Sequence, residues 1–403
     1  MEFNEYLLKD IATIIMGQSP KSEYYSDFNG TPFLQGNRTF NNLYPTIDTY
    51  TTKITKTAEK NDILFSVRAP VGEINIAPFE LCIGRGLSAI RSKNKDNKFL
   101  HYLLIYKLKD IHSKSTGTIF NSINKSTLEN LEIKIPNEKF QKFIGTLLRN
   151  IDNKVELNNK IIANLEELSQ TLFKHWFVDF EFPDEGGNPY KSSGGEMIDS
   201  ELGEIPSDWK VGVLSDMTEI IMGQSPKSDT YNNNKVGLPL LNGASDFKNR
   251  NIKPTKYTSD PKKIGHNLDY VFGVRATIGL VTELDGEYAI GRGAGLSKNN
   301  EENREFIYET LNQAFTYFER IGSGSVYINI SSKDLKQYKL IIPSKQVLMK
   351  YHYQLEPIFS ELHNRKEQIT SLMNLRDTLL PKLMSGELEI PDDIEVNSDE
   401  FSI

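Results

Sequence analysis

The chain has 403 residues, of which 38% are hydrophobic and 25% charged, and its formal net charge is −7. That length leaves room for two or three domains. No stretch approaches the ~18 consecutive apolar residues of a membrane span, and the start of the chain has no signal-peptide pattern. The only cysteine, Cys82, excludes an internal disulfide and a multi-cysteine zinc site. We expect it to be a small buried hydrophobe in a reducing, cytoplasmic protein.

The negative charge is concentrated in two short segments. Residues 181–208 carry eight acids and one lysine, and residues 387–403 carry seven acids and no base. Residues 1–136 and 209–343 are mildly basic, with net charges of +3 and +2. The uneven distribution permits a polyanionic partner, although the total charge is negative.

A nine-residue string, IIMGQSPKS, occurs at residues 14–22 and again at 220–228. Further pairs keep an offset of 206 to 207 residues: FSVRAPVG at 65–72 matches FGVRATIG at 272–279, and IGRG begins at both 83 and 290. This period is far too long for a solenoid repeat. The sequence therefore predicts two copies of one domain, copy one at 1–136 and copy two at 209–343.

Each copy reads as a strand-rich, mixed α/β domain. In copy one we expect a strand within 9–17, a short strand at 32–37 that ends in a turn, a pair of strands about a tight turn at 61–77, and a strand at 81–92 that a Gly-Arg-Gly loop breaks. Residues 97–113 have the apolar spacing of a helix, and a final strand precedes Pro136.

Two long helices follow the copies, at 137–180 and 344–386. Their apolar residues alternate at gaps of four and three, as in a heptad seam: Ile144, Leu148, Ile151, Val155, Ile162, Leu165 and Leu172 in the first helix, and Tyr351, Leu355, Ile358, Leu362, Ile369, Leu372 and Leu379 in the second. The polar seam residues Asn158 and Ser169 recur 207 residues later as Arg365 and Arg376.

We predict that the two helices pack on each other as an antiparallel coiled coil. The alternative is that each helix packs only on its own globular copy. An acidic, Gly-rich linker at 181–208 and an acidic tail at 387–403 complete the organisation.

Familiar catalytic patterns are missing from the sequence. It contains no phosphate-binding G-x-x-x-x-G-K-[ST] loop, no H-E-x-x-H pair and no G-x-S-x-G elbow. The six histidines show no metal-ligand spacing, and the Asn188-Pro189-Tyr190 triplet lies in the Gly-rich linker without a cofactor loop. We therefore expect no catalytic residue and no metal site.

The repeated loops carry basic and amide side chains among small residues. Gln18, Ser19, Lys21, Arg68 and Arg85 of copy one match Gln224, Ser225, Lys227, Arg275 and Arg292 of copy two. Small neighbours let a backbone approach a phosphate, and arginine can also fork onto a guanine edge. An alternative is that the arginines pair with acids of their own domain that are near in sequence: Glu73 and Glu80, or Glu283 and Glu287.

The loops that differ between the copies are better candidates for sequence reading, because identical motifs cannot read different bases differently. If the target is DNA, we expect base contacts from Asn37, Arg38 and Asn42 in copy one and from Asn242, Ser245, Lys248 and Arg250 in copy two.

Taken together, these motifs resemble the specificity (S) subunit of a type I restriction–modification system. The resemblance rests on the paired MGQSPKS turns, NDILFSVRAPVG with VFGVRATIG, the two IGRG loops, the linker GGEMIDSELGEIPSDW, and the helix ends LEELSQTLFKHWF and LMNLRDTLLPKLMSGEL. It covers residues 5 to 390 or so. Asn61 departs from the family, which often has Gly there.

The resemblance implies two target-recognition domains, each reading one half of a bipartite DNA site, with the paired helices setting the spacer. It implies two methyltransferase (M) subunits that use S-adenosylmethionine, and restriction motor (R) subunits that use ATP and Mg. This chain would bind none of those cofactors itself. A competing hypothesis is a two-domain coiled-coil scaffold or adhesin-like protein with a non-DNA ligand. An S-like chain of a related methylation complex fits equally well.

Overall fold

The computed structural model describes residues 1–113, 122–275, 277–300, 302–322, 330–391 and 393–394, and only the backbone of 109–113, 249, 250 and 322. The chain divides into two compact units. One comprises 1–161 with 364–403, and the other comprises 162–363. Each unit therefore joins one sequence copy to part of both long helices.

Copy one is strand-rich, as its sequence predicts. Its strands are β1 (Phe3–Leu7), β2 (Ala12–Met16), β3 (Tyr25–Ser26), β4 (Thr31–Leu34), β5 (Tyr50–Thr51), β6 (Thr57–Ala58), β7 (Ile63–Ser66), β8 (Ile74–Ile76), β9 (Leu81–Ile83), β10 (Leu87–Ser92) and β11 (Glu132–Pro136). Its helices are α1 (Leu8–Ile11), α2 (Asn97–Ser113) and α3 (Lys125–Glu129), with a 3-10 turn at Ser22–Tyr24.

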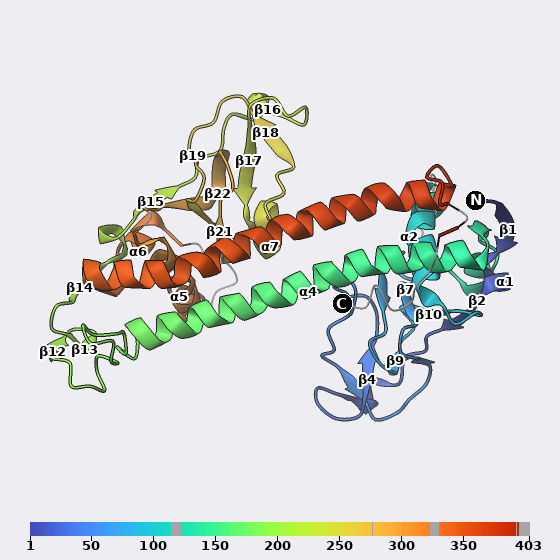
Figure 1. Cartoon of the computed structure of the whole chain (residues 1–403), viewed down its shortest axis with the longest axis horizontal. Helices are drawn as coiled ribbons and strands as arrows, with labels where there is room; N and C mark the ends of the chain where they lie inside the picture. The colour runs from blue at the N-terminus through green and yellow to red at the C-terminus, as the bar shows by residue number, and fades with distance from the viewer. Residues whose placement is uncertain (114–121, 276, 301, 323–329, 392, 395–403) are drawn as a thin grey trace. The chain divides into compact units, whose positions relative to one another are not determined.

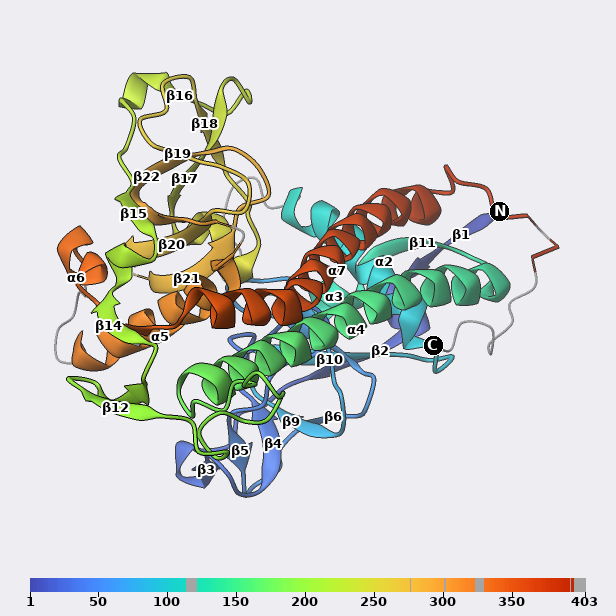
Figure 2. The same cartoon turned by 60° about the vertical axis from the view of Figure 1, so that its left-hand side comes forward.

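Two larger sheets build most of copy one, in the orders β2-β10-β7-β8 and β3-β5-β4-β9-β6, and β1 pairs with β11 in a smaller one. The strands of the second sheet lie together in Figure 2. Strand β7 is buried on both faces, with Ile63 and Phe65 in the core beneath α2 and α4, and Leu64 in the core shared with the second sheet. This explains why the consecutive residues Ile63, Leu64 and Phe65 are all apolar and do not alternate with polar ones.

Copy two repeats the plan. Its strands are β14 (Lys210–Val213), β15 (Glu219–Met222), β16 (Tyr231–Asn232), β17 (Leu238–Gly243), β18 (Lys256–Thr258), β19 (Ile264–Gly265), β20 (Tyr270–Arg275), β21 (Thr277–Glu283), β22 (Tyr288–Lys298) and β23 (Lys339–Ile342). Its helices are α5 (Arg304–Gly322) and α6 (Ser332–Lys336), with 3-10 segments at Leu214–Asp216, Ser228–Thr230 and Ala244–Arg250.

The Gly-Arg-Gly segment interrupts the strand in copy one but not in copy two. In copy one, Gly84–Gly86 separates β9 from β10, as the sequence predicts. In copy two, β22 continues through Gly291–Gly293 and joins the strands into one sheet with the order β16-β18-β17-β22-β20-β21. In both copies the strand that enters this loop also has a parallel neighbour, β4 beside β9 and β17 beside β22.

The predicted antiparallel pairing of the long helices, α4 (Glu138–Phe177) and α7 (Lys345–Ser385), is confirmed (Figures 1 and 2). Tyr351, near the start of α7, lies edge-on to Phe177 at the end of α4, with ring centroids 4.7 Å apart. Arg376, near the end of α7, donates to Oδ1 of Asp152 in the first half of α4 at 2.8 Å.

Each helix packs on both copies, so the alternative in which each contacts only its own copy is wrong. The end of α4 places Phe173 and Phe177 in one core with Phe306 of copy two. The end of α7 places Leu383 in one core with Leu8 of copy one. Predicted seam residues are accordingly buried, among them Ile144, Leu148, Val155, Leu355 and Leu362.

The acidic linker between α4 and β14 contains ordered structure. Strands β12 (Met197–Ser200) and β13 (Gly203–Pro206) form a hairpin in it. The ring of Phe182 stacks on Trp209 with centroids 4.9 Å apart, and on Tyr190 at 4.6 Å. These aromatic contacts anchor a segment whose composition alone is typical of a flexible chain.

Candidate nucleic-acid interfaces

The repeated QSPKS turn packs on the Gly-Arg-Gly loop of its own copy. In copy one, the backbone N–H of Gln18 donates to the carbonyl of Ile83 at 2.9 Å. The hydroxyl of Ser19 accepts a hydrogen bond from the backbone N–H of Arg85 at 3.1 Å. A Cβ on Gly17 would overlap the carbonyl oxygen of Gly84, so only glycine fits there.

Copy two reproduces these contacts. The backbone N–H of Gln224 donates to the carbonyl of Ile290 at 2.9 Å, and Ser225 Oγ accepts from the backbone N–H of Arg292 at 3.3 Å. A Cβ on Gly223 would overlap the carbonyl oxygen of Gly291. The identity of the two strings thus has a structural cause, since the same turn must dock on the same loop. Ser19 and Ser225 hold that docking through their hydroxyls.

A third loop joins this contact in each copy. Gln35 follows β4 and Asn242 lies near the end of β17, each beside its Gly-Arg-Gly loop. A Cβ on Gly84 would lie 2.8 Å from Cα of Gln35, and one on Gly86 would lie 2.7 Å from its carbonyl oxygen. In copy two, a Cβ on Gly293 would lie 2.3 Å from the carbonyl oxygen of Asn242, and one on Gly291 would lie 2.3 Å from its side-chain Oδ1 and 2.9 Å from its Cα.

Arg68 and Arg275 come from the strand on the other side of the loop. The backbone N–H of Val67, the neighbour of Arg68, donates to the carbonyl of Gly86 at 2.9 Å. Arg275 ends β20, which pairs with β22 through Gly273 opposite Ala294. The structure therefore brings the turn, the Gly-Arg-Gly loop and the flanking arginine together in each copy.

These side chains are exposed. Gln18, Lys21, Arg68 and Arg85 are exposed in copy one, as are Gln224, Lys227, Arg275 and Arg292 in copy two. Lys21 lies 3.9 Å from the Glu23 carboxylate, an exposed and therefore weak pair. Within the described part of the chain, none of the four arginines forms an ion pair, so the pairing with nearby acids is not what the structure shows.

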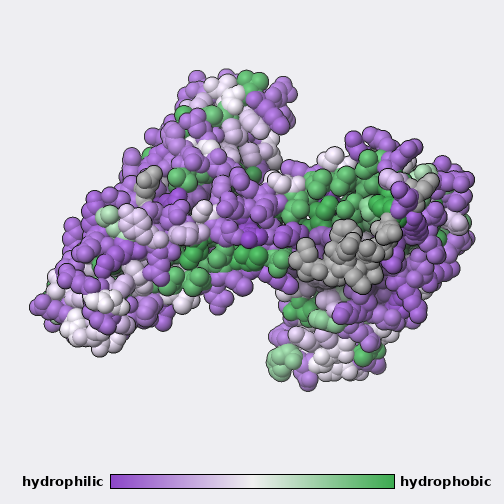
Figure 3. Space-filling model, viewed as in Figure 1, coloured by the Kyte–Doolittle hydropathy of each residue, from purple (hydrophilic) through white to green (hydrophobic). Residues whose placement is uncertain are grey.

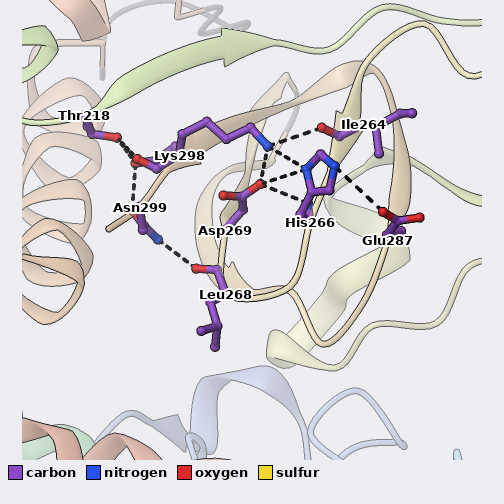
Figure 4. A network of polar contacts seen from close by, with 9 residues as sticks. Thr218, Ile264, His266, Leu268, Asp269, Glu287, Lys298 and Asn299 are labelled. Atoms are coloured by element: carbon purple, nitrogen blue, oxygen red, sulfur yellow. Dashed lines mark hydrogen bonds and ion pairs between the residues drawn. The ribbon is translucent and has the colours of Figure 1, made fainter. Parts of the chain in front are cut away.

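A buried carboxylate fixes the strands that carry these arginines. In copy two, Nζ of Lys298 donates to Asp269 Oδ2 at 2.5 Å and lies 2.9 Å from Nδ1 of His266 (Figure 4). In copy one, Arg91 forks onto Asp62 with two bonds of 2.7 Å. The Lys298–Asp269 contact joins the end of β22 to the start of β20. The Arg91–Asp62 contact joins the end of β10 to the start of β7 in the same way.

The turn just before this carboxylate needs a left-handed residue in both copies. Asn61 has φ +70° and Leu268 has φ +69°. Asparagine tolerates this conformation far better than leucine does, and glycine tolerates it best. The departure at Asn61 is therefore conformationally mild.

The downstream loop of copy one is well structured. Arg38 pairs with Asp48 at 2.6 Å, and its guanidinium holds the pKa of that exposed carboxyl below its usual value. The carbonyl of Asn37 accepts from the backbone N–H of Phe40 at 3.0 Å. Asn42 is exposed. Arg38 is therefore engaged with Asp48, Asn37 is half-buried, and Asn42 alone of the three is both exposed and outside such a contact.

The corresponding loop of copy two is the 3-10 segment at Ala244–Arg250. Phe247 is fully buried and anchors it, and the buried Asp246 accepts from the backbone N–H of Asn242 at 2.7 Å. Ser245 and Lys248 are exposed, as is Asn242. The side chain of Arg250 lies outside the described residues.

Gln35 is the residue that sequence reasoning overlooked. It occupies the place of Asn242, but the copies diverge after this point, and the surrounding letters PFLQG and PLLNG share only a Pro, a Leu and a Gly. That short alignment was the available signal. Ser245 and Lys248, by contrast, have no counterpart of similar backbone structure in copy one.

The described residues contain no sign of a membrane span or of a metal centre. No helix among them has the length and apolar character needed to cross a bilayer. No three of their His, Cys, Asp or Glu side chains are placed so as to hold a metal ion together.

Known proteins share this arrangement. The Methylase_S family, the type I restriction modification DNA specificity domain, matches residues 1–167 and 206–370. The putative type I restriction enzyme MjaX specificity subunit of Methanocaldococcus jannaschii is 44% identical over 346 residues, 82% of this chain and 79% of that protein. The MjaIX specificity subunit of the same organism is 27% identical over 415 residues, 95% and 93% of the two chains.

A solved structure shows the same fold. The type I restriction–modification system S subunit from M. genitalium covers 95% of this chain and 96% of its own, with a TM-score of 0.61 at 19% identity. Two copies of a mixed α/β domain, each packed on part of an antiparallel pair of long helices, are the fold that the two chains share. The chain belongs to the family of type I restriction–modification DNA specificity subunits.

Proposed function

We propose that each copy reads one half of a bipartite DNA site and that the paired helices set the distance between the halves. The observation that carries this proposal is the duplication itself. One exposed cluster of the turn, the Gly-Arg-Gly loop and the flanking arginine occurs twice, and each is followed by a loop that differs. Dimeric DNA-binding proteins work in the same way, because each of their two equivalent domains binds one half-site.

The shared residues serve the sugar-phosphate backbone in this proposal. Lys21, Arg68 and Arg85 of copy one, with Lys227, Arg275 and Arg292 of copy two, are exposed cations on glycine-rich loops. Such groups position a protein on DNA without reading sequence. Gln18 and Gln224 lie beside them. Ser19 and Ser225 act indirectly, by holding the loop that presents the arginine.

The divergent loops supply base contacts. In copy one these are Asn37, Arg38 and Asn42, and in copy two Asn242, Ser245, Lys248 and Arg250. The side chain of Arg38 is paired with Asp48 at 2.6 Å. It must therefore leave Asp48 before it can contact a base or a phosphate. That exchange costs little at an exposed site.

The long helices support the spacer role by their length. A helix of 40 residues, such as α4, is ~60 Å long. Its first half packs with copy one and its last turns pack with copy two. A pair of such helices is stiff enough to act as a ruler.

Partner subunits complete the proposed assembly. We assign S-adenosylmethionine to two methyltransferase subunits, and ATP and Mg to restriction motor subunits, all in the cytoplasm. The exposed apolar residues Leu157 and Leu168 of α4 and Leu375 of α7 support helix-mediated contact with such partners. In Figure 3 a hydrophobic strip follows part of α4, and further hydrophobic areas lie elsewhere on the same face.

Methylome sequencing of the host tests the proposal. With the gene present, methylated adenine is expected within a split motif that has two specific halves and a fixed gap. Deletion of the gene removes that methylation, and a plasmid copy restores it. Persistence of every split-motif pattern after deletion would show that the chain does not direct methylation.

A further inference from the structure

We infer that the residue wedged against the Gly-Arg-Gly loop in each copy, Gln35 in copy one and Asn242 in copy two, reads an adenine in its own half-site. This inference rests on the proposed function and adds to it a named base contact in each half. The two residues lie 207 positions apart, at the offset of the sequence repeat, and the structure gives them equivalent places beside the loop.

The backbone of both residues is held unusually tightly. The carbonyl of Gln35 accepts a hydrogen bond from the N–H of Gly86 at 3.2 Å, and the carbonyl of Leu34 accepts from Gly84 at 2.8 Å. The N–H of Asn242 donates to the buried Asp246 carboxylate at 2.7 Å. A Cβ on Gly84, Gly86 or Gly293 would meet the backbone of residue 35 or 242, and one on Gly291 would meet both the Oδ1 and the Cα of Asn242. A side chain that reads a nucleotide needs a backbone that is held in place in this way.

The side chains themselves remain exposed beside exposed arginines. Gln35 and Asn242 are both exposed, and so are Arg85 and Arg292 in the adjacent loops. The Oδ1 of Asn242 receives one weak hydrogen bond, from Ser225 Oγ at 3.4 Å. That bond orients the amide but is weak enough to exchange for a base.

The amide group selects the ligand chemistry. A phosphate only accepts hydrogen bonds, and the neighbouring arginine meets that need better than a neutral amide does. A side-chain amide offers one acceptor and one donor side by side, which matches N6 and N7 of adenine in the major groove. The same chemistry at equivalent places in both copies therefore assigns one adenine to each half-site.

The test uses the full chain in complex with its methyltransferase subunits and a library of duplexes in which both half-sites are randomised. Selection is run with wild type, Gln35→Ala, Asn242→Ala and the acceptor-only variants Gln35→Glu and Asn242→Asp. The exposed Asn233 of copy two, substituted by Ala, is the matched control. Thermal unfolding of each variant verifies folding.

Each alanine variant should lose about 10- to 100-fold of the preference for adenine at a single position, Gln35→Ala in one half and Asn242→Ala in the other. The carboxylate variants should shift that position toward cytosine, whose N4 donates a hydrogen bond. Asn233→Ala should select the wild-type motif.

Three results would overturn the inference: an unchanged motif, relaxation at a position other than adenine, or equal weakening on all sequences, which identifies a phosphate contact. Failure of the proposed function looks different, because wild type itself would then select no bipartite motif. The acceptor-only variants keep the test decisive if an alanine variant unfolds, since they preserve side-chain size.

Discussion

Arg365 of α7 donates a hydrogen bond from Nη1 to Oδ1 of Asn158 of α4 at 3.2 Å, although the two residues occupy the same position in the two sequence copies, 207 residues apart. In an antiparallel pair of equivalent helices, a residue meets its own counterpart only at the local two-fold axis. The contact therefore places these two equivalent seam positions opposite each other in the helix pair. Asn158 is fully buried there and also donates to Gln368 at 3.3 Å.

The Asn158–Arg365 contact should fix the helix register at some cost in stability. Asn158→Leu alone leaves the Arg365 guanidinium without this acceptor and should lower stability by about 1 kcal/mol. Adding Arg365→Leu should recover that loss, because an apolar pair suits the seam better. Thermal midpoints of the single and double variants check this, and a double variant less stable than Asn158→Leu would contradict it.

Seven residues added to both long helices, one heptad in each, should widen the gap between half-sites. The insertion lengthens each helix by ~10 Å, close to three base steps of ~3.4 Å. Methylome sequencing of a host carrying the lengthened chain measures the gap directly. Insertion into α4 alone is the control, and it should abolish methylation because the two seams lose register. An unchanged gap in the double insertion would mean that the helices are not the ruler.

Glycine at position 17 should be irreplaceable, whereas glycine at position 36 should not. A Cβ on Gly17 overlaps the carbonyl of Gly84, while a Cβ on Gly36 meets nothing within 4 Å. Gly17→Ala should therefore cost about 1–3 kcal/mol and weaken recognition of one half-site only. Gly36→Ala is the matched control, expected to leave the thermal midpoint within a degree or so. Equal midpoints for both variants would contradict the docking of the turn.

The buried Asp246 carboxyl should make copy two sensitive to pH. Burial raises its pKa above 3.8, against the opposing effect of the N–H groups of Asn242 and Gly243. The folded state thus keeps the proton to a higher pH than the unfolded chain does. The contribution of the Asp246 carboxyl to the free energy of unfolding is therefore fully present below pH 3.8. It is lost as the pH rises through the folded-state pKa.

Asp246→Asn removes that titration. The thermal midpoint of wild type minus that of the variant should fall as pH is raised from about 4 and then level off. A difference that rises with pH over the same range would mean that the loop N–H groups dominate over burial and stabilise the charged carboxylate.

Periodic and repeated features were predictable from the sequence. The heptad spacing from Ile144 onward predicted the long helices, and the matching polar positions predicted their register. The pairing itself was correctly predicted because Asn158 and Arg365 occupy equivalent seam positions. Long-range identity at IIMGQSPKS likewise revealed the two copies without any structural knowledge.

The site was only partly predictable, because it depends on contacts between loops far apart in sequence. Nothing local to Gln35 shows that Gly84 and Gly86 close around it, since that contact arises from a parallel pairing of β4 with β9. The hydrogen bond by which Ser19 holds the backbone of Arg85 could not be predicted from the sequence either. Tertiary aromatic contacts at Phe182 and Trp209 likewise order a linker whose glycine content favours flexibility.

The most direct test of the two-reader account is domain exchange followed by methylome sequencing. Residues 209–343 are replaced by the second recognition domain of another family member, with both long helices left intact. The account predicts that one half of the methylated motif changes to the donor's sequence, while the other half and the gap stay as they were. Change in both halves, or in neither, would contradict the claim that each copy reads its own half-site.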